Sequence, residues 1–349
     1  MPAVDSTALP DTLCAWTRNL GHIMIRNVEV EIGGQRIDRQ YGEWLTIFAE
    51  LTLQPGLVAG YAEMIGNTAD MFTFSNSLPA KTLYIPLQFW FNRNPGLALP
   101  LIALQYHEVK INIEFRPLSN LLQCKNNELD QPEAGPTGIS MQAASLYVDY
   151  VYLDTDERRR FAQVSHEYLI EQLQYTGEES ISNAHNKIRL NFNHPVKELV
   201  WVARLASAEA NNQWSNFTTG VLGSEAYAGG NPMIGAKLQL NGHDRFSWRQ
   251  SRYFNLVQPY QHHTNIPATG IYVYSFGWKP EEHQPSGTAN FSRIDNATFQ
   301  MTFLSGLFTT NLDTSLQQNG YTTINLLISA VNYNVLRIMS GMGGLAYSN

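Results

Sequence analysis

The amino-acid sequence predicts an all-β protein made of two sandwiches, and three observations lead to this fold class. Apolar and polar residues alternate with a period of two along many stretches, which is typical of antiparallel strands with one buried face. The 349 residues exceed the length of most single sandwiches or barrels, so two domains are expected. Helical spacing, by contrast, recurs in two short places.

Alternating stretches fill the first half of the chain. In the earliest of them Val28, Val30 and Ile32 alternate with polar residues, and two glycines then end the run. Strands are predicted at 28–32, 83–91, 109–115 and 146–152. Residues 1–157 are therefore predicted to form the first sandwich domain.

Two segments predict helices. Large apolar residues recur at helical spacing from Tyr41 to Leu51. Asp154 is followed by Asp156 and Glu157, a pattern that predicts an N-cap and a helix running through about Ala162. Because this second helix lies between two β-rich stretches, we predict that it connects the two domains.

The second domain is predicted to span residues 158–349. Asn241-Gly242 is a typical hairpin turn, and the polar, Gly-rich stretch 207–231 predicts a long exposed loop. Phe-x-x-x-Pro ends one aromatic stretch at Pro95 and another at Pro280, which hints at a duplication, although chance explains this echo equally well. Strands are predicted at 188–192, 198–204, 270–278, 290–303 and 322–338.

Charge argues against direct nucleic-acid binding. The net charge is −7, whereas proteins that wrap nucleic acid need clustered Lys and Arg. The run Arg158-Arg159-Arg160 follows three acidic residues, so a solvated helix face is favoured over a phosphate clamp. Charged residues are 15% of the chain, below the roughly 25% of ordinary globular proteins. This low content hints at surfaces covered by neighbouring subunits.

The cysteines and the N-terminus suggest a protein that stays in the cytosol. Cys14 and Cys124 stand at no metal-ligand spacing and make no disulfide framework, which suits a reducing compartment. No apolar run approaches the ~20 residues of a membrane span. The first residues lack the pattern of a signal peptide.

No group of residues predicts catalysis, a metal or a cofactor. His283, Glu281 and Glu282 lie near His262 and His263 in sequence, but two adjacent histidines on a strand face opposite sides and could not jointly hold one metal ion without a bulge. Glu29 and Glu31 share a strand face and could form an acid pair, but strand alternation already explains them. The phosphate-loop pattern is missing, and the glycines at 341–344 predict a tight turn. We therefore expect a protein that is not an enzyme.

Three Asn-x-Ser/Thr sequons are candidate glycosylation positions, at Asn216, Asn290 and Asn296. Without a signal peptide they would not meet the glycosylation machinery of a secretory pathway. Ordinary polar roles are therefore the favoured interpretation of all three asparagines.

Long, ordered segments resemble the major capsid proteins of nucleocytoplasmic large DNA viruses, the group of phycodnaviruses, mimiviruses and iridoviruses. The last of them is NYNVLRIMSGMGGLAYSN, at 332–349. The segments that carry the resemblance are 28–38 with 41–44, 99–111, 253–263, 270–276, 280–287, 290–296 and 332–349.

The resemblance implies a double jelly roll, that is, two consecutive jelly-roll β-sandwiches. Three copies would form a pseudo-hexagonal capsomer, a homotrimer that tiles an icosahedral shell over an internal membrane. Minor capsid proteins would be further partners, and the virion, assembled in the host cytoplasm, would be the location. The loop at 207–231 would then belong to the outward tower of the trimer.

The resemblance also implies a departure from the family. Family members have an extended arm and several strands before the segment that matches 14–38, so the first jelly roll is expected to lack its N-terminal strands. A fragment or wrong start codon, a split gene and a diverged paralogue are three explanations. A minor capsid paralogue, a surface protein that binds glycans or a receptor, and a carbohydrate-active jelly-roll enzyme are the competing functions, and the last lacks an acid pair.

Overall fold

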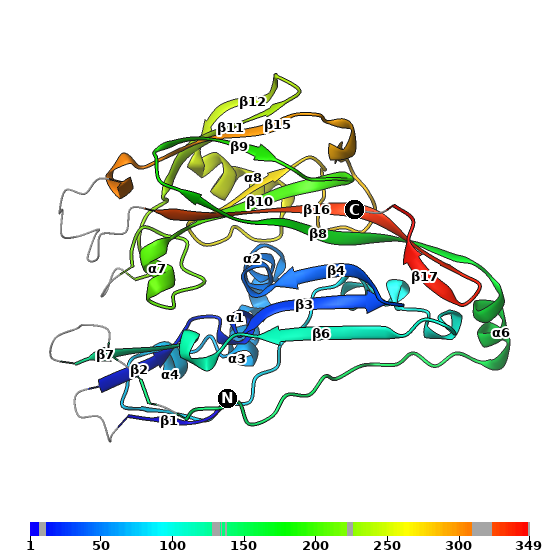
Figure 1. Ribbon diagram of the computed structural model, residues 1–349, viewed down its shortest axis with the longest axis horizontal. Coiled ribbons are helices and arrows are strands. Elements are labelled where there is room, and N and C mark those ends of the chain that lie inside the picture. Colours follow the sequence, from blue (N-terminus) through cyan, green and yellow to red (C-terminus); the bar gives the residue numbers. More distant parts are fainter. Residues whose placement is uncertain are drawn as a thin grey trace.

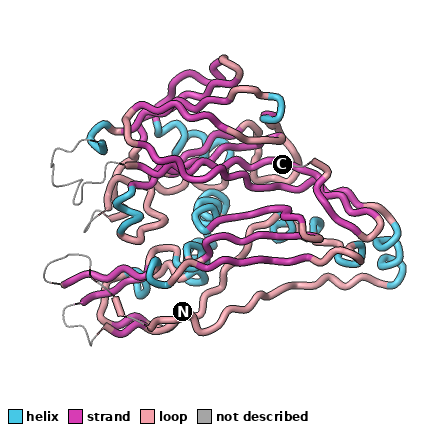
Figure 2. Tube along the Cα trace, in the orientation of Figure 1, coloured by secondary structure: helices cyan, strands magenta, loops and turns pink. Residues whose placement is uncertain are grey.

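The computed structural model describes residues 1–6, 12–127, 133, 135–136, 138–221, 226–308 and 323–347. Parts of the predicted loop at 207–231 and of the predicted strand at 322–338, together with the last two residues, lie outside these ranges. The two halves of the chain form two sheet systems that lie one above the other in Figure 1. Figure 2 shows strands in both of them, and in the first half helices and long loops surround these strands.

The second half forms a sandwich of two facing sheets. In the six-stranded sheet the order is β13 (Ile271–Ser275), β10 (Pro195–Leu205), β16 (Ile324–Met339) and β17 (Met342–Leu345), while β14 (Ala289–Asn290) pairs with β10 and β8 (His166–Ile181) with β16. In the four-stranded sheet the order is β12 (His243–Gln250), β11 (Met233–Leu240), β15 (Ala297–Phe303) and β9 (His185–Leu190). Asn241 and Gly242 both have positive φ and turn β11 into β12, so the predicted hairpin is confirmed.

The first half contains three smaller sheets. The largest has the order β4 (Gln35–Tyr41), β3 (Ile25–Ile32) and β6 (Val109–Phe115). Two strand pairs accompany it: β2 (Thr12–Trp16) with β7 (Leu122–Asn126), and β1 (Val4–Asp5) with β5 (Ser77–Leu78). The alternation at 28–32 and 109–115 thus predicted two neighbouring strands of one sheet.

Both predicted helices are confirmed. The Asp154 carboxylate accepts hydrogen bonds from the amides of Asp156 and Glu157 and caps α6, which joins the two halves. The α-helices are α1 (Leu20–Ile23), α2 (Gly42–Thr52), α3 (Val58–Ile65), α4 (Ala69–Phe72), α5 (Trp90–Arg93), α6 (Thr155–Gln163), α7 (Ala206–Ala210) and α8 (Gln258–His262). A π-helix spans Tyr253–Val257, and 3₁₀ turns span Pro55–Leu57, Pro95–Leu97, Leu101–Ala103, Leu118–Asn120, Phe291–Arg293 and Ser305–Phe308.

The strand predicted at 83–91 is wrong. Residues 79–88 pair with no described strand, and α5 begins at Trp90. Pro86 has no backbone N–H to give to a ladder. The Asn92 side chain accepts a hydrogen bond from the Phe89 amide and starts the helical turn instead. The alternation there reflects side chains that pack on the core of the first half, among them Leu83, Ile85, Leu87 and Phe91.

The strand predicted at 146–152 is also wrong, since this stretch is extended but pairs with no described strand. It belongs to the long segment between β7 and α6 that runs along the lower edge of the molecule in Figure 1. Eleven consecutive residues, 142–152, are exposed to solvent. The alternation correctly predicted an extended backbone, but it could not show that no described strand lies beside this stretch.

The loop predicted at 207–231 is less exposed than expected. It begins as α7 and then folds inward, where Asn216 is fully buried and Phe217 packs on the six-stranded sheet. The Asn216 side-chain amide donates to the carbonyl of Gly220 and to Gln213 Oε1. Polar residues in this loop therefore satisfy the backbone of a buried turn, a role that composition does not reveal.

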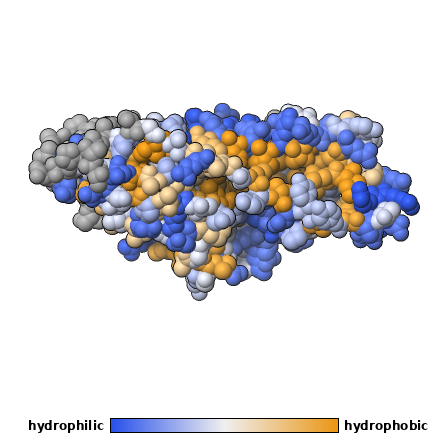
Figure 3. Space-filling view, turned by 90° about the horizontal axis from the view of Figure 1, so that it is seen from below, coloured by the Kyte–Doolittle hydropathy of each residue, from blue (hydrophilic) through white to orange (hydrophobic). Residues whose placement is uncertain are grey.

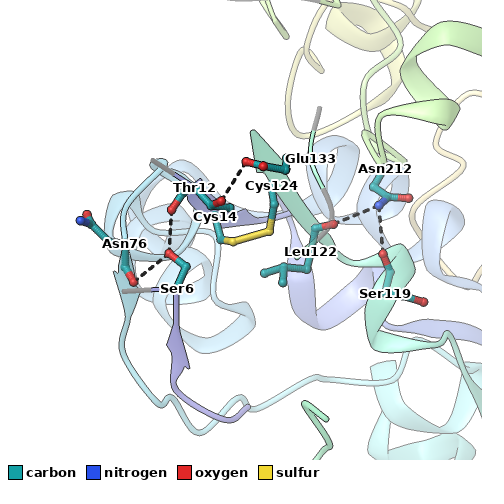
Figure 4. The surroundings of a disulfide bond; sticks show 9 residues. All are labelled: Ser6, Thr12, Cys14, Asn76, Ser119, Leu122, Cys124, Glu133 and Asn212. Carbon is teal, nitrogen blue, oxygen red and sulfur yellow. Dashed lines mark hydrogen bonds between the residues drawn. A yellow bond between two sulfur atoms is a disulfide. The ribbon is translucent and has the colours of Figure 1, made fainter. Parts of the chain in front are cut away.

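Cys14 and Cys124 form a disulfide, which corrects the expectation of unpaired cysteines (Figure 4). They lie 110 positions apart in sequence, so their spacing gives no signal. The antiparallel register of β2 and β7 sets them opposite each other, with Cα atoms 4.2 Å apart. Asn212 of the second half donates to the carbonyls of Ser119 and Leu122 beside this pair.

Removing the disulfide is expected to destabilise the first half. The variant Cys14→Ala/Cys124→Ala should lower the free energy of unfolding by about 2–5 kcal/mol, because the cross-link closes a long loop in the unfolded chain. Urea denaturation with and without a reductant measures this change. The reductant should destabilise the parent protein and leave the double variant unaffected. Equal stability of both proteins in oxidising buffer would contradict the expectation.

Candidate functional site at the joint between the two halves

Helix α2 of the first half packs on the outer face of the six-stranded sheet of the second half. Trp44, Ile47 and Leu51 are buried on the side of α2 that faces this sheet. They contact an apolar patch formed by Val200, Val202, Ile271, Val273, Leu327 and Val331. The sheet is thus apolar on both faces, because its other face contacts the four-stranded sheet. The joint is a hydrophobic core in its own right.

Loop residues of the second half hold the C-terminal end of α2. The Asn265 amide donates to the carbonyl of Leu51 over 2.9 Å, and its side chain donates to the carbonyl of Leu53. The Ala268 amide donates to Glu50 Oε2 over 2.9 Å. The two Asn265 bonds satisfy carbonyls that the end of a helix leaves free, and the Ala268 bond holds a side chain of the last turn.

A buried arginine forms the polar centre of the joint. Arg204 is fully buried on β10, and its guanidinium lies 3.2 Å from Glu43 of α2, 2.8 Å from Glu178 of β8 and 3.1 Å from Glu209 of α7. The same guanidinium donates to the carbonyl of Trp214 over 3.2 Å. Arg116, next to β6, adds a second bond of 2.6 Å to Glu43. The carboxylate of Glu43 therefore bridges one arginine from each half.

The carboxylates keep Arg204 charged in spite of its burial. Burial opposes the charged form, but Glu43, Glu178 and Glu209 outweigh it and raise the pKa of Arg204 above its usual value. Burial raises the pKa of Glu178, although Arg204 opposes this shift. Each charge in the network thus depends on its partners.

A second ion cluster ties α5 to the six-stranded sheet. Glu171 of β8 is buried and binds Arg93 of α5 over 2.6 Å and Lys197 of β10 over 2.7 Å. Lys197 also donates to the carbonyl of Pro280. Burial lowers the pKa of Lys197, and Glu171 and Glu198 oppose that shift. As at Glu43, a single carboxylate here binds one cation from each half of the chain.

His263 lies between two carboxylates. Its Nε2 is 3.0 Å from Glu198 of β10, and its Nδ1 donates to Glu281 over 2.9 Å. Burial opposes protonation, but the two carboxylates prevail and raise the pKa of His263 to about 9. The residue closes α8 rather than lying on a strand as expected. Its imidazolium is a buried cation that forms a hydrogen bond through Nδ1 and an ion pair through Nε2.

His263 predicts how stability depends on pH. A histidine whose pKa is raised on folding stabilises the protein fully below the unfolded value of 6.5, and this contribution is lost as the pH rises through about 9. The loss over that window is on the order of 3 kcal/mol. Chemical denaturation at several values from about pH 6 to about pH 10 should show this decline in the parent protein and not in His263→Gln. The exposed His185 serves as control, since His185→Gln should decline as the parent does.

The C-terminal hairpin of β16 and β17 is fastened to the first half. His107 Nδ1 lies 3.0 Å from the Gly343 carbonyl and 3.1 Å from the Gly343 amide. The His107 ring lies where a Cβ at Gly33 would be, and the Tyr106 ring lies where a Cβ at Gly341 would be. Both glycines have positive φ, so the turns and the close contacts each require glycine. Three of the family-like segments, around 33, 107 and 343, thus meet at one contact.

The remaining residues singled out in the sequence lie apart from the joint. Glu29 binds Arg39 over 2.9 Å and Glu31 accepts from Asn112 over 3.3 Å, so each carboxylate has its own partner. Asn296 is exposed, Asn290 is half-buried and Asn216 is buried. Arg158, Arg159 and Arg160 are exposed on α6. Sequence patterns predicted no site at the joint, although charged residues inside the apolar run of β10 were a usable signal.

Within the described ranges, no group of three or more His, Cys, Asp or Glu side chains is arranged to hold a metal ion. No helix of the described chain is both long and apolar enough to cross a membrane.

Comparison with known proteins finds relatives along the whole chain. A family model described as "Large eukaryotic DNA virus major capsid protein" matches residues 157–344, and one described as "Major capsid protein N-terminus" matches residues 2–154. A major capsid protein of Pyramimonas orientalis virus is 50% identical over 370 residues, covering 99% of this chain and 81% of the relative. That of Paramecium bursaria Chlorella virus 1 is 43% identical over 356 residues, covering 93% and 79%.

Solved structures share the fold. A quasi-atomic model of the PBCV-1 virus capsid is 37% identical and superposes with a TM-score of 0.75, covering 97% of this chain and 88% of that one. The Faustovirus major capsid protein has a TM-score of 0.72 at 14% identity, covering 94% and 74%, and so supports the fold alone. The chain is a double jelly roll and belongs to the family of major capsid proteins of large eukaryotic DNA viruses.

Proposed function

We propose that this capsid protein acts as a homotrimer whose six sandwiches give a pseudo-hexagonal capsomer. The observation that carries the proposal is the joint: α2 and the Arg204 network hold two sandwiches side by side as one block. Three such blocks around a three-fold axis present six similar units to their surroundings. The proposed role of the protein is therefore structural: its trimers would tile the capsid shell.

Mass and shape test the trimer. Size-exclusion chromatography with light scattering should give three times the 39.3 kDa of one chain, and negative-stain images should show particles with a hexagonal outline. The variant Arg204→Met serves as a comparison. Because it loosens the joint, its particles should have a less regular hexagonal outline in negative stain while their mass by light scattering stays that of a trimer. A monomer at high concentration would overturn the trimer.

The division of the chain into 1–157 and 158–349 belongs to the same proposal. It is supported by α6, whose exposed residues separate the two sheet systems, and by the two family models, which meet beside it. The joint nevertheless predicts that residues 158–349 expressed alone would expose Val200, Val202 and Ile271. That fragment should bind a hydrophobic dye strongly, and weak binding would speak against the joint.

The proposed role includes location, partners and chemistry. The protein would reside in the virion shell, be assembled in the host cytoplasm and contact minor capsid proteins above an internal membrane without spanning it. It would carry no catalytic activity and bind no nucleic acid, which the engaged carboxylates Glu29 and Glu31 and the net charge of −7 support. Of the three sequons, Asn296 is the position where a glycan would fit without unfolding a turn. Intact-mass analysis of Asn296→Gln from infected cells tests that point.

A further inference from the structure

The two halves of the chain contain the same hairpin with the same irregularity. Its turn lies at 33–34 between β3 and β4 and at 241–242 between β11 and β12, and all four turn residues have positive φ. In each second strand the third residue after the turn is left out of the pairing, namely Ile37 in β4 and Arg245 in β12. The two hairpins therefore correspond residue by residue in their backbone pairing.

Each hairpin leads directly into a helix. α2 follows β4 without a gap, and a helix at 251–262, which comprises the π-helix and α8, follows β12 in the same way. Because Tyr41 and Gln250 pair with corresponding residues of β3 and β11, position 42 matches position 251. In this alignment Leu45 matches Phe254, and each of them is buried in the core of its own half.

The same face of both helices is apolar, but only that of α2 is covered in the described chain. Residues of α2 that pack on the six-stranded sheet have apolar counterparts in the 251–262 helix. The matching pairs are Ile47 with Leu256, Phe48 with Val257 and Leu51 with Tyr260. Leu256 and Val257 are each 40% exposed and Tyr260 is 78% exposed, and the exposed ring of Trp278 lies beside His262 at the end of the helix. An exposed apolar face of this kind marks a contact surface.

We propose that the 251–262 helix packs on the first half of a second copy of this chain, as α2 packs on the second half of its own chain. A face that repeats the apolar face of α2 selects a sandwich as its partner. In every copy α2 already occupies the outer face of the six-stranded sheet, so the first half is the sandwich that remains. Figure 3 shows apolar residues along the side of the first half that lies away from α2.

This contact rests on the proposed trimer and names its interface. It joins the second half of one copy to the first half of the next, and three such head-to-tail contacts close a ring. Around that ring one kind of joint would occur six times, alternately within a chain and between chains. The polar contacts of the two joints differ, because the exposed Arg252 matches Glu43, the partner of Arg204.

Photo-cross-linking locates the partner of the helix. Tyr260→p-benzoylphenylalanine keeps an aromatic ring at an exposed position. Isotope-labelled and unlabelled full chains of this variant are mixed before assembly and then illuminated, and linked peptides are identified by mass spectrometry. The expected links join a labelled to an unlabelled chain and end within residues 1–157 of the second copy. Links that end in residues 158–349 of the second copy, or that stay within one copy, overturn the proposal.

A charge on the helix measures how much the contact contributes to association. Tyr260→Asp would place a carboxylate in an apolar interface, so self-association should weaken at least about tenfold in sedimentation equilibrium. The side chain is exposed, so circular dichroism should show an unchanged fold. Tyr347→Asp is the matched control, since Tyr347 is 62% exposed but lies after β17, away from the helix in sequence. It should associate as the parent does, and equal effects of the two variants overturn the proposal.

The contact and the proposed function fail in different ways. A parent protein that stays monomeric overturns the trimer and this contact with it. A trimeric parent whose Tyr260→Asp variant associates normally, with no link from position 260 to the first half of another copy, overturns this contact and leaves the trimer standing.

Discussion

Arg204→Met is expected to lower the free energy of unfolding by about 3–5 kcal/mol, because it strands three carboxylates around a buried position. Glu43 would keep Arg116 as a partner, but Glu178 and Glu209 would lose the cation that offsets their burial. The carboxylates would then bind protons more tightly in the folded state. The destabilisation should therefore shrink as the pH falls from 7 towards about 5.

Chemical denaturation of the full chain at these two pH values measures both effects. Arg204→Lys should fall between the parent and Arg204→Met, since one ammonium cannot contact three carboxylates and the Trp214 carbonyl together. Arg26→Met is the matched control, because Arg26 and Glu114 form a solvent-exposed ion pair, and such pairs contribute little to stability. A loss in Arg204→Met no larger than that of Arg26→Met would show that the network does not hold the joint.

Local patterns predicted much of this fold. Alternation located β3 and β6, helical spacing located α2, the acidic cap located α6, and Asn241-Gly242 located the hairpin of β11 and β12. In each case the signal lies within about ten residues of sequence. The side chains that make up each signal contact the backbone nearby or lie on one face of a single helix or strand. Such features are readable because their physical cause is local.

Features that depend on a distant partner could not be predicted in this way. The stretches 83–91 and 146–152 alternate as strands do, yet a strand exists only where another backbone supplies hydrogen bonds. Cys14 meets Cys124 only through the register of β2 and β7. The sequence shows each residue but not its neighbour across the fold.

The joint illustrates a signal that was present but ambiguous. Lys197, Glu198 and Arg204 interrupt the apolar run of β10, and charged residues in a buried strand are almost always paired. Their partners Glu171, Glu43 and His263 lie on three other elements. The run therefore indicated buried ion pairs, but tertiary structure was needed to show that one of them, Arg204 with Glu43, connects the two halves.

Trp201→Ala is expected to cost about 3–5 kcal/mol, because Trp201 is the fully buried centre of the second sandwich. Its ring lies 4.7 Å from that of Phe299 on the facing sheet and 5.2 Å from that of Phe254 in the π-helix. Tyr272 of β13 stacks beside it at 5.9 Å. An alanine here leaves a cavity that three rigid aromatic rings cannot fill, so both the transfer energy and the packing energy are lost.

Trp201→Phe separates packing from hydrogen bonding. The indole N–H of Trp201 is buried and has no hydrogen-bond partner among the residues that the structure describes, and an unpaired buried donor costs about 1–3 kcal/mol. Phenylalanine keeps most of the ring contacts and removes that donor, so its net cost should stay below about 1.5 kcal/mol. Urea denaturation of both variants at one pH tests this difference. Equal losses of unfolding free energy in the two variants would mean that the indole forms a hydrogen bond in solution. A small loss in Trp201→Ala would mean that the aromatic cluster can close around the cavity.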